Sequence, residues 1–356
     1  MAKSSRHVGK EFLKVLNVIS GSAGGGAERF FERISISLNK ENKFDVRVVI
    51  RKNKKRSNFF KLNKIEVYEL NFYNKFDFLS KSKFVKICKE FKPNLIVTWM
   101  NRASLMIPEK KFNNEIRIGR LGGFYKLKNY INCDYLIANT EEIRKYIIDK
   151  GWDKNKVFYL PNFVQENSFP NFKRKDSDKI ILGIGRFHEN KNFETVIKAL
   201  DQLPEYKLWL VGEGFLKTEY ISVAKKYKVQ ERVKIFSWED KISKYYNSVD
   251  VVVCSSIIEP LGNVILEAWS HKVPVIAANV MGPANLIKHK VNGLKFQKKN
   301  IRKLVECVKI LDANKELKQK IIQNGFEIFT KYYSEKNVTK KYINFFYKVN
   351  KLCVDS

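Results

Sequence analysis

Short apolar segments alternate with amphipathic segments along most of the chain. In the first half, the apolar segments that we expect to be strands are 12–19, 44–50, 65–70, 94–99, 116–120, 135–138 and 157–160. Between them lie stretches with a helical period, the clearest of which places on one face Ala27, Phe30, Phe31, Ile34 and Leu38. Strands and helices in alternation predict a parallel, doubly wound α/β sheet.

A polar run at 165–179, which contains a proline, interrupts this alternation. A second series of expected strands follows at 179–184, 206–211, 233–236, 249–254, 273–277 and 293–296, and residues from about 301 onward read as helices. We therefore expect two Rossmann-like domains, at 1–168 and 179–335, joined by a linker at 169–178, with a C-terminal helix at 336–356.

The composition agrees with two domains and adds a strong positive charge. Of 356 residues, 44% are hydrophobic and 29% charged, and 68 Lys and Arg against 37 Asp and Glu give a net charge of +31. Such a charge favours a polyanionic partner.

The densest basic run, 51–64, also carries two phenylalanines and suits an anionic membrane surface through Lys54, Lys55, Arg56, Phe59 and Phe60. The alternative is a solvated loop in a chain rich in lysine throughout.

Other features of the sequence bear on location. No segment reaches the ~18 apolar residues that a membrane-spanning helix needs, and the polar N-terminus predicts no cleaved signal peptide. The five cysteines form no C-x-x-C pair, which is typical of reduced thiols and indicates neither zinc nor disulfides. We expect a cytoplasmic protein, with peripheral contact at the inner face of the cell membrane as a hypothesis.

A glycine cluster, Gly24, Gly25 and Gly26, separates the first expected strand from the first helix. It is not a P-loop, because Ala27 and Glu28 stand where the lysine and the hydroxyl residue are required. The dinucleotide fingerprint G-x-G-x-x-G fails as well. What remains is a backbone that a ligand can approach closely, followed by a helix N-terminus that favours phosphate; the alternative is a tight turn.

The second half carries more specific chemistry. Arg186 follows a strand, and Lys191 precedes a helix, so two cations suited to a diphosphate lie at one edge of the sheet. Gly212 makes another turn at a strand end. Glu259 precedes a helix that we expect to start near Asn263, and Glu267 lies one turn inside it, leaning back toward the same edge. Carboxylates suit sugar hydroxyls, so the combination indicates a nucleotide-diphosphate sugar.

The segment from Glu259 to Glu267 resembles the E-x7-E motif of the retaining glycosyltransferases of the GT-B fold, family 4, also described as glycosyl transferases group 1. "GGAER", "CDYLIANTEEIRKYIIDKGWDKNKVFYLPNFV", "GIGRFHENKN" and "VNGLKF" also resemble segments of that family. The resemblance implies two Rossmann-like doubly wound domains facing across a cleft. The first would lie on the acceptor side, the second would bind the nucleotide sugar, and the C-terminal helix would return to the first domain.

The resemblance also implies residue roles. Arg186 and Lys191 would hold the donor diphosphate, Glu259 the transferred sugar, and Glu267 the ribose. The donor would further meet Gly212, the backbone of Leu261, Gly262 and Asn263, and, from the opposite domain, Gly24, Gly25 and Gly26. The implied reaction is front-face transfer with retention and without metal or cofactor. The one D-x-D, 176–178, lies in the linker before a strand, where a metal site is not expected.

The chain also departs from the family pattern. A histidine is frequent in the first domain of the family, but 117–130 contains none, and its place on the acceptor side falls to Gly122, Gly123 or Tyr125. His271 we expect to be structural. The donor is expected to be a UDP-sugar, with a GDP-sugar as the alternative, and the acceptor a glycan or lipid-linked glycan precursor of the cell surface.

Two other functions are disfavoured by the sequence. A nucleotide-sugar epimerase of the same fold needs acid–base side chains, and the chain has only four histidines. A nucleic-acid-binding protein would concentrate its basic residues on one element, whereas here they are spread over both halves. Nucleic acid is therefore not an expected partner.

Overall fold

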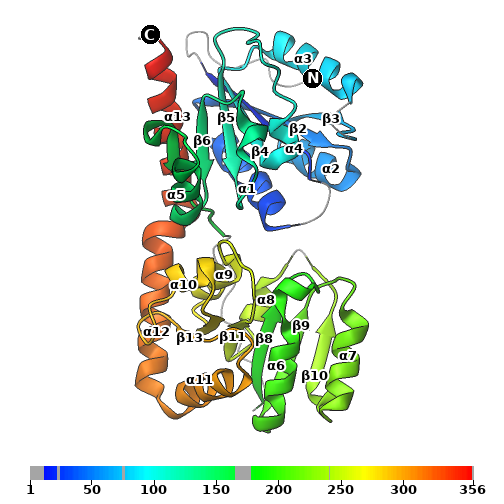
Figure 1. The fold of residues 1–356 in the computed structure, drawn as a ribbon, viewed down its shortest axis with the longest axis vertical. Helices are drawn as coiled ribbons and strands as arrows, with labels where there is room; N and C mark the ends of the chain where they lie inside the picture. Colours follow the sequence, from blue (N-terminus) through cyan, green and yellow to red (C-terminus); the bar gives the residue numbers. More distant parts are fainter. Residues whose placement is uncertain (1–11, 22–24, 74–76, 165–177, 240, 355–356) are drawn as a thin grey trace. The chain divides into compact units, whose positions relative to one another are not determined.

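The computed structural model describes residues 12–21, 25–73, 77–164, 178–239 and 241–354. The chain forms two compact units (Figure 1). The first consists of Met1–Asn162 together with Val338–Ser356, and the second of Phe163–Asn337. The chain therefore passes between the units twice, once after Asn162 and once before Val338.

The first unit is built on a seven-stranded sheet with the order β3-β2-β1-β4-β5-β6-β7, in which all neighbouring strands are parallel. Its strands are β1 (Leu13–Ile19), β2 (Phe44–Arg51), β3 (Glu66–Leu70), β4 (Leu95–Trp99), β5 (Ile116–Leu121), β6 (Tyr135–Ala138) and β7 (Val157–Tyr159). All seven predicted strands of this half are confirmed, because strands buried on both faces read as short apolar runs.

Helices cover both faces of this sheet (Figure 1). They are α1 (Gly26–Lys40), α2 (Lys54–Leu62), α3 (Phe78–Phe91), α4 (Met100–Ser104), α5 (Glu141–Asp149) and α13 (Glu335–Val354), with 3-10 turns at Leu127–Tyr130 and Lys154–Lys156. The predicted apolar face of α1 is buried: the rings of Phe30 and Phe31 lie 5.7 and 5.4 Å from that of Trp99. Tyr342 of α13 lies 6.0 Å from Phe30, so the C-terminal helix packs on α1.

The second unit has a six-stranded parallel sheet with the order β10-β9-β8-β11-β12-β13. Its strands are β8 (Lys179–Ile184), β9 (Tyr206–Val211), β10 (Val233–Phe236), β11 (Val251–Cys254), β12 (Val275–Ala278) and β13 (Leu294–Phe296). The predicted strands at 249 and 273 begin two residues later. Asp250 instead accepts a hydrogen bond from the Ile180 backbone at 2.7 Å, and Pro274 has no N–H for the ladder.

Alternate side chains of β8 enter two separate cores, one on each face of this sheet. Ile181 packs with α6 and α11, whereas Leu182 and Ile184 pack with α9. The helices of the unit are α6 (Phe193–Ala199), α7 (Lys217–Lys226), α8 (Ser243–Tyr246), α9 (Asn263–Ser270), α10 (Met281–Leu286), α11 (Ile301–Ala313) and α12 (Lys315–Ile328); short turns lie at Glu189–Lys191, Leu200–Gln202, Gln230–Arg232 and Phe329–Tyr333. Helices on both faces of a parallel sheet confirm the doubly wound prediction.

In both sheets the winding reverses at the middle, between β1 and β4 and between β8 and β11. Ligands of open α/β sheets bind outside the carboxyl ends of the strands at such a reversal. Arg186 and Lys191 follow β8, and Glu259 follows β11. The fold therefore places Arg186, Lys191 and Glu259 at the carboxyl edge of the second sheet, where the sequence predicts a ligand site.

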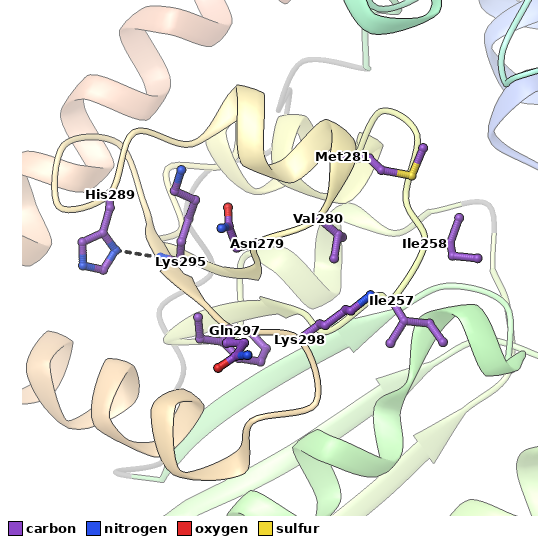
Figure 2. Close-up of a pocket in the computed structure, with 10 residues that line it drawn as sticks. Ile257, Ile258, Asn279, Val280, Met281, His289, Lys295, Gln297 and Lys298 are labelled. Atoms are coloured by element: carbon purple, nitrogen blue, oxygen red, sulfur yellow. Dashed lines mark hydrogen bonds between the residues drawn. The ribbon is translucent and has the colours of Figure 1, made fainter.

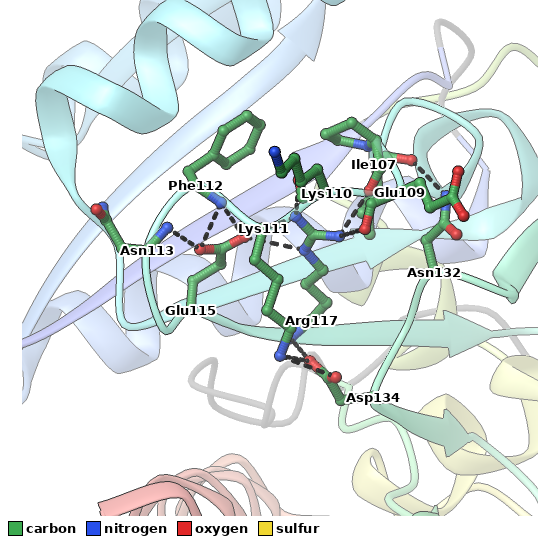
Figure 3. A network of polar contacts seen from close by, with 11 residues as sticks. Ile107, Glu109, Lys110, Lys111, Phe112, Asn113, Glu115, Arg117, Asn132 and Asp134 are labelled. Atoms are coloured by element: carbon green, nitrogen blue, oxygen red, sulfur yellow. Dashed lines mark hydrogen bonds and ion pairs between the residues drawn. The ribbon is translucent and has the colours of Figure 1, made fainter.

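A buried ion pair fixes the opposite, amino-terminal edge of the first sheet (Figure 3). Glu115 and Arg117 are 2 and 1% exposed, and their side chains meet at 2.8 Å. Arg117 also donates to the carbonyls of Pro108, Glu109 and Lys110, while Glu115 accepts from the backbone N–H groups of 112 and 113. This network fixes the loop between α4 and β5, and it includes none of the predicted site residues.

Candidate functional site

Two glycines let the loops after β8 and β9 touch. Gly185 has φ +147°, a conformation that only glycine adopts readily, and its N–H donates to the Val211 carbonyl at 3.0 Å. A Cβ on Gly212 would collide with the Gly185 carbonyl oxygen. Gly212 is therefore required for packing of the two loops, which is how the chain turns Arg186 and Lys191 toward the carboxyl edge of the sheet.

Lys191 and Glu259 form an ion pair at this edge. The Lys191 ammonium contacts Glu259 Oε2, which also accepts a hydrogen bond from Ser256 Oγ at 3.1 Å. The two side chains are 22 and 15% exposed, so the pair is partly shielded from solvent. The structure thus places together two of the three residues predicted to be catalytic.

Two hydrogen bonds fix the loops that carry this ion pair. Ser255 Oγ donates to the Lys191 carbonyl at 2.8 Å, and the Ile257 N–H donates to the Asn190 carbonyl at 2.8 Å. Both bonds join the loop after β8 to the loop after β11. These bonds hold the two loops together, so the backbone that carries Lys191 is fixed relative to the backbone that leads to Glu259.

The electrostatic setting keeps Lys191 charged. Burial alone would lower its pKa, but the Glu259 carboxylate, with smaller contributions that include Glu267, outweighs it and the pKa is raised.

Arg186, the third predicted catalytic residue, is different. Its side chain is exposed and, among the described residues, makes no hydrogen bond or ion pair. The edge thus carries one cation that is neutralised by a carboxylate and one that is available to an anion from solution.

The start of α9 lies directly after Glu259 and is held by α10. Gly262 has φ +94° and begins the helix, and Leu261 is 6% exposed. The Gly282 N–H donates to the Glu259 carbonyl at 3.0 Å, and a Cβ on Gly282 would collide with the Leu261 carbonyl. This packing fixes the backbone of Leu261, Gly262 and Asn263 beside the ion pair.

Glu267 lies deeper than Glu259. It is 7% exposed and its Oε2 accepts a hydrogen bond from the Tyr246 hydroxyl at 2.7 Å. His271, one turn further, stacks on Tyr246 with ring centroids 4.8 Å apart, and its Nδ1 lies 2.7 Å from the Glu267 carbonyl. Burial lowers the pKa of His271. These contacts agree with the structural role expected for His271, and Tyr246 is a site residue that the sequence reasoning missed.

A cavity of about 700 Å³ lies beside this site, at the carboxyl ends of β12 and β13 (Figure 2). Its walls are mainly apolar, and Lys298 extends along it toward Ile257. It shares with the site the loop that leads into Glu259, but none of the predicted donor residues lines it. The residues of its wall are Ile257, Ile258, Asn279, Val280, Met281, His289, Lys295, Phe296, Gln297 and Lys298.

In the first unit, the glycine turn before α1 is covered by Glu28. A Cβ on Gly21 or Gly25 would collide with its carboxylate oxygens, and α1 begins at Gly26 with Gly25 as its cap residue. Gly24 lies outside the described residues. The glycines here make room for Glu28, a contact that the spacing did not predict.

Gly122, Gly123 and Tyr125 follow β5, at the carboxyl edge of the first sheet. Burial is the main cause that raises the pKa of the Tyr125 phenol; nearby Arg120 lowers it and Glu28 raises it. Arg120 lies at the end of β5 and is only 1% exposed. The sequence reasoning did not single out Arg120, although a charged residue inside an apolar strand is a signal that could have found it.

The prediction of membrane contact by the basic run at 51–64 is wrong for two of its five residues, because Arg56 and Phe60 are 5 and 0% exposed. The alternative of a solvated loop is wrong as well, since the run contains α2. Arg56 pairs with Glu32 at 2.7 Å and donates to the Gly21 carbonyl at 2.6 Å. Neither side chain is available to a membrane, whereas Lys54, Lys55 and Phe59 are exposed.

Two smaller predictions concern metal and the linker. Asp176 and Ser177 of the D-x-D lie outside the described residues, and Asp178 pairs with Lys207. Within the described ranges, no group of three or more His, Cys, Asp or Glu side chains is arranged to hold a metal ion. Metal independence itself stays a prediction.

The family comparison concerns the second unit in particular. Residues 164–328 match the family described as glycosyl transferases group 1. The lipopolysaccharide core biosynthesis glycosyltransferase LpsE of Rhizobium meliloti (strain 1021) is 29% identical over 326 residues, which cover 90% of this chain and 95% of that protein. LpsD of the same organism is 28% identical over 342 residues, 94% of this chain and 98% of that protein.

Solved structures agree in fold. Anabaena HepE, in its complex with UDP-glucose, has a TM-score of 0.81 at 18% identity, covering 94% of this chain and 99% of that one. A glycosyltransferase of Rickettsia africae ESF-5 has a TM-score of 0.81 at 19% identity, covering 95% and 98%. At these identities the likeness concerns the fold alone. Together with the two parallel sheets and the family match, it identifies the chain as a glycosyltransferase of the GT-B fold whose second unit matches the glycosyl transferases group 1.

Proposed function

We propose that this chain is a retaining, metal-independent glycosyltransferase that moves a sugar from a UDP-sugar to a hydroxyl of a glycan or lipid-linked glycan precursor of the cell surface. The observation that carries the proposal is the Lys191–Glu259 pair at the winding reversal of the second sheet, with the exposed Arg186 on the same loop. A diphosphate and a sugar hydroxyl are the two ligands that these side chains suit together.

The proposed reaction uses charge stabilisation rather than a protein base. Arg186 and Lys191 bind the diphosphate and stabilise the negative charge that develops as the bond between the sugar and phosphate breaks. The acceptor hydroxyl attacks the sugar carbon on the face from which the diphosphate leaves and gives its proton to the departing phosphate oxygen. Glu259, released from Lys191 by the phosphate, accepts hydrogen bonds from hydroxyls of the sugar.

Glu267 is proposed to bind the ribose hydroxyls of the donor. The Tyr246 hydroxyl donates a hydrogen bond to one oxygen of this carboxylate and fixes its orientation. The second carboxylate oxygen can accept a hydrogen bond from a ribose hydroxyl. Gly212 and the backbone at 261–263 complete the proposed donor site in this unit.

The identity of the substrates is supported by relatives. HepE of Anabaena was solved with UDP-glucose, which favours UDP over GDP for a chain of the same fold. LpsE and LpsD are named for lipopolysaccharide core biosynthesis, which favours an acceptor of that kind. On the acceptor side, the proposed contacts are Gly122, Gly123 and Tyr125.

Cytoplasmic location with peripheral membrane binding is a further part of the proposal. Among the described helices, none combines the length and the apolar character needed to span a bilayer. The exposed Lys54, Lys55 and Phe59 are the part of the basic run that remains for lipid contact. Co-sedimentation with vesicles containing anionic lipid tests this, since Lys54→Ser with Lys55→Ser should weaken binding and the same change at the exposed pair Lys225 and Lys226 should not.

The donor site is tested by thermal unfolding with UDP, GDP and ADP, each with EDTA and with Mg²⁺. A nucleotide at ~100-fold its Kd adds about 2.7 kcal/mol of stability, which raises the Tm by several degrees. We expect UDP to stabilise in EDTA and Arg186→Ala to lose the shift. Stabilisation only with Mg²⁺ would contradict metal independence, and no response to any nucleotide would contradict the donor site.

Retention needs a separate measurement. The anomeric configuration of the product, determined by NMR from a UDP-α-sugar, should be α. A β product would require inversion and would overturn the front-face mechanism.

A further inference from the structure

The cavity at the carboxyl ends of β12 and β13 has no role in the donor site proposed above (Figure 2). Its volume is about 700 Å³, which lies within the range of ~300–1,000 Å³ that is typical of small-molecule sites. None of the residues proposed to bind the donor lines it. A cavity of this size at the carboxyl edge of a parallel sheet is a candidate site for a second ligand.

Apolar side chains form most of the cavity wall. Val280 and Phe296 are 8 and 3% exposed, whereas Ile258 is 51% exposed although it is large and apolar. An exposed apolar side chain at the wall of a cavity becomes more stable when an apolar ligand covers it. The wall therefore favours a ligand with an apolar body.

Lys298 gives the cavity a positive charge. Figure 2 shows its side chain extending along the wall toward Ile257. Among the described residues, its ammonium forms no hydrogen bond or ion pair, and those that line the cavity include no Asp or Glu. Lys295, the other lysine of the wall, donates to the Ala284 carbonyl at 3.2 Å, which is a neutral partner. The cavity thus favours a negative charge next to an apolar surface.

The backbone of the wall is strained at Met281. This residue has φ +29°, in the left-handed region that residues with a side chain rarely adopt. The next residue, Gly282, donates to the Glu259 carbonyl at 3.0 Å, and a Cβ on Gly282 would collide with the Leu261 carbonyl. Strained residues persist where the surrounding structure fixes them, and they cluster at ligand sites. The strain is thus a second, independent sign of a ligand at this wall.

The compounds of the proposed reaction differ in whether they match this chemistry. A nucleotide sugar carries negative charge and hydroxyls, but it has no apolar body. A water-soluble glycan also lacks an apolar body. A lipid-linked glycan precursor in which a phosphate joins the lipid to the glycan has both features side by side, as the cavity requires.

We propose that the cavity binds the lipid phosphate of the acceptor, with the phosphate at Lys298 and the first carbons of the lipid against Ile258 and Val280. The site rests on the proposed function and narrows it, because it selects the lipid-linked glycan from the two acceptor classes. Ile258 directly precedes Glu259, so the acceptor and the transferred sugar contact the same loop.

Two exposed residues of the wall can be changed without removing a buried side chain. Lys298→Ala removes the ammonium, and Ile258→Ser removes the exposed apolar side chain. The matched controls are Lys288→Ala and Ile221→Ser, which make the same changes at exposed positions of this unit that do not line the cavity.

Calorimetric titration of the full chain with octyl phosphate, below its micelle concentration, measures the site. Octyl glucoside supplies the chain without the charge, and inorganic phosphate supplies the charge without the chain. The wild type should bind octyl phosphate about 10-fold more tightly than either. Hexyl phosphate should bind roughly 15-fold more weakly than octyl phosphate, since each methylene contributes about a factor of four.

The variants separate the cavity from the general charge of the chain. Lys298→Ala should abolish most of the preference for octyl phosphate over octyl glucoside, and Ile258→Ser should weaken the binding of both octyl compounds, whereas the two controls should bind as the wild type does. Equal affinities of the wild type for octyl phosphate and octyl glucoside would overturn the site. An equal loss in Lys298→Ala and Lys288→Ala would also overturn it, because the net charge of +31 would then explain the binding.

Two further titrations test the assignment to the acceptor. Saturating UDP should leave the Kd of octyl phosphate unchanged, and competition would overturn the cavity site, since the phosphate would then bind at Arg186 and Lys191. The phosphodiester of octanol and glucose should bind at least as tightly as octyl phosphate; a loss of about 10-fold would overturn the assignment, because no glycan could then extend from the phosphate. If UDP does not bind at all, the proposed donor site fails, while octyl phosphate and Lys298→Ala still decide on the cavity.

Discussion

Replacing Glu259 by glutamine should strengthen the binding of UDP while it weakens the transfer of sugar. In the free protein Glu259 neutralises Lys191, so a diphosphate must displace this carboxylate before it reaches the ammonium. Glu259→Gln keeps the size of the side chain and removes its charge. UDP lacks the sugar and gains only from the freed cation, whereas a UDP-sugar loses the carboxylate that is proposed to bind its hydroxyls.

The magnitude follows from the burial of the pair. A hydrogen bond to a charged group contributes ~1.5–3 kcal/mol when well shielded, and exposed pairs contribute ~0.2–1 kcal/mol. At 22 and 15% exposure the pair lies between these cases. We expect a net gain of about 1 kcal/mol for UDP, or roughly fivefold in Kd. The loss of the sugar contact should lower kcat/KM about 10- to 100-fold.

Calorimetric titration of UDP and steady-state transfer assays measure the two effects. Lys191→Met should weaken UDP binding, and adding Glu259→Gln to it should change UDP binding no further, because the carboxylate then has no cation to occupy. Weaker UDP binding in Glu259→Gln, or undiminished turnover, would refute the arrangement. A UDP effect of Glu259→Gln that persists beside Lys191→Met would show that the carboxylate acts on another group.

Three other predictions concern stability and pH. Glu115→Ala leaves Arg117 buried without its partner and should lower the free energy of unfolding by about 3 kcal/mol, seen as a lower Tm in circular dichroism, while Glu90→Ala on an exposed pair should change it little. Arg56→Ala, which removes the contacts to α1 and its preceding turn, should also lower the Tm, and an unchanged Tm would contradict its structural role. Burial lowers the pKa of His271 in the folded protein. The stability that its neutral form contributes is therefore present above about pH 6.5, the ordinary pKa, and is lost as the pH falls from this value toward the folded pKa. His271→Phe should flatten the dependence of Tm on pH between 5 and 7.

The strands could be predicted from the sequence because both sheets are parallel and covered on both faces. Their residues are then nearly all apolar, and each run such as 95–99 is visible without knowledge of its neighbours. The Lys191–Glu259 pair could be predicted to a lesser degree. Its members follow β8 and β11, and adjacency of these strands is the usual consequence of a winding reversal.

Contacts between distant residues could not be predicted in this way. Arg56 reads as one basic residue in a basic run, and only the position of Glu32 on α1 explains why it is buried. Arg120 finds its partners 42 and 222 residues away. Periodicity places a residue on a face of its own element, but it carries no information about which distant side chain completes that face.

The pairing of Lys191 with Glu259 also has a consequence for selectivity. A chain with a charge of +31 attracts every phosphate in its surroundings, and a bare lysine at the site would bind them all. Because Lys191 is already paired, a simple phosphate must separate two opposite charges and leaves Glu259 without a partner. In the proposed function a nucleotide sugar presents a diphosphate to the cation and hydroxyls to the carboxylate, so it would satisfy both members of the pair at once. The ion pair therefore adds, beside the unpaired Arg186, a preference for phosphate compounds that also carry hydroxyls, which is the class that the proposed reaction needs.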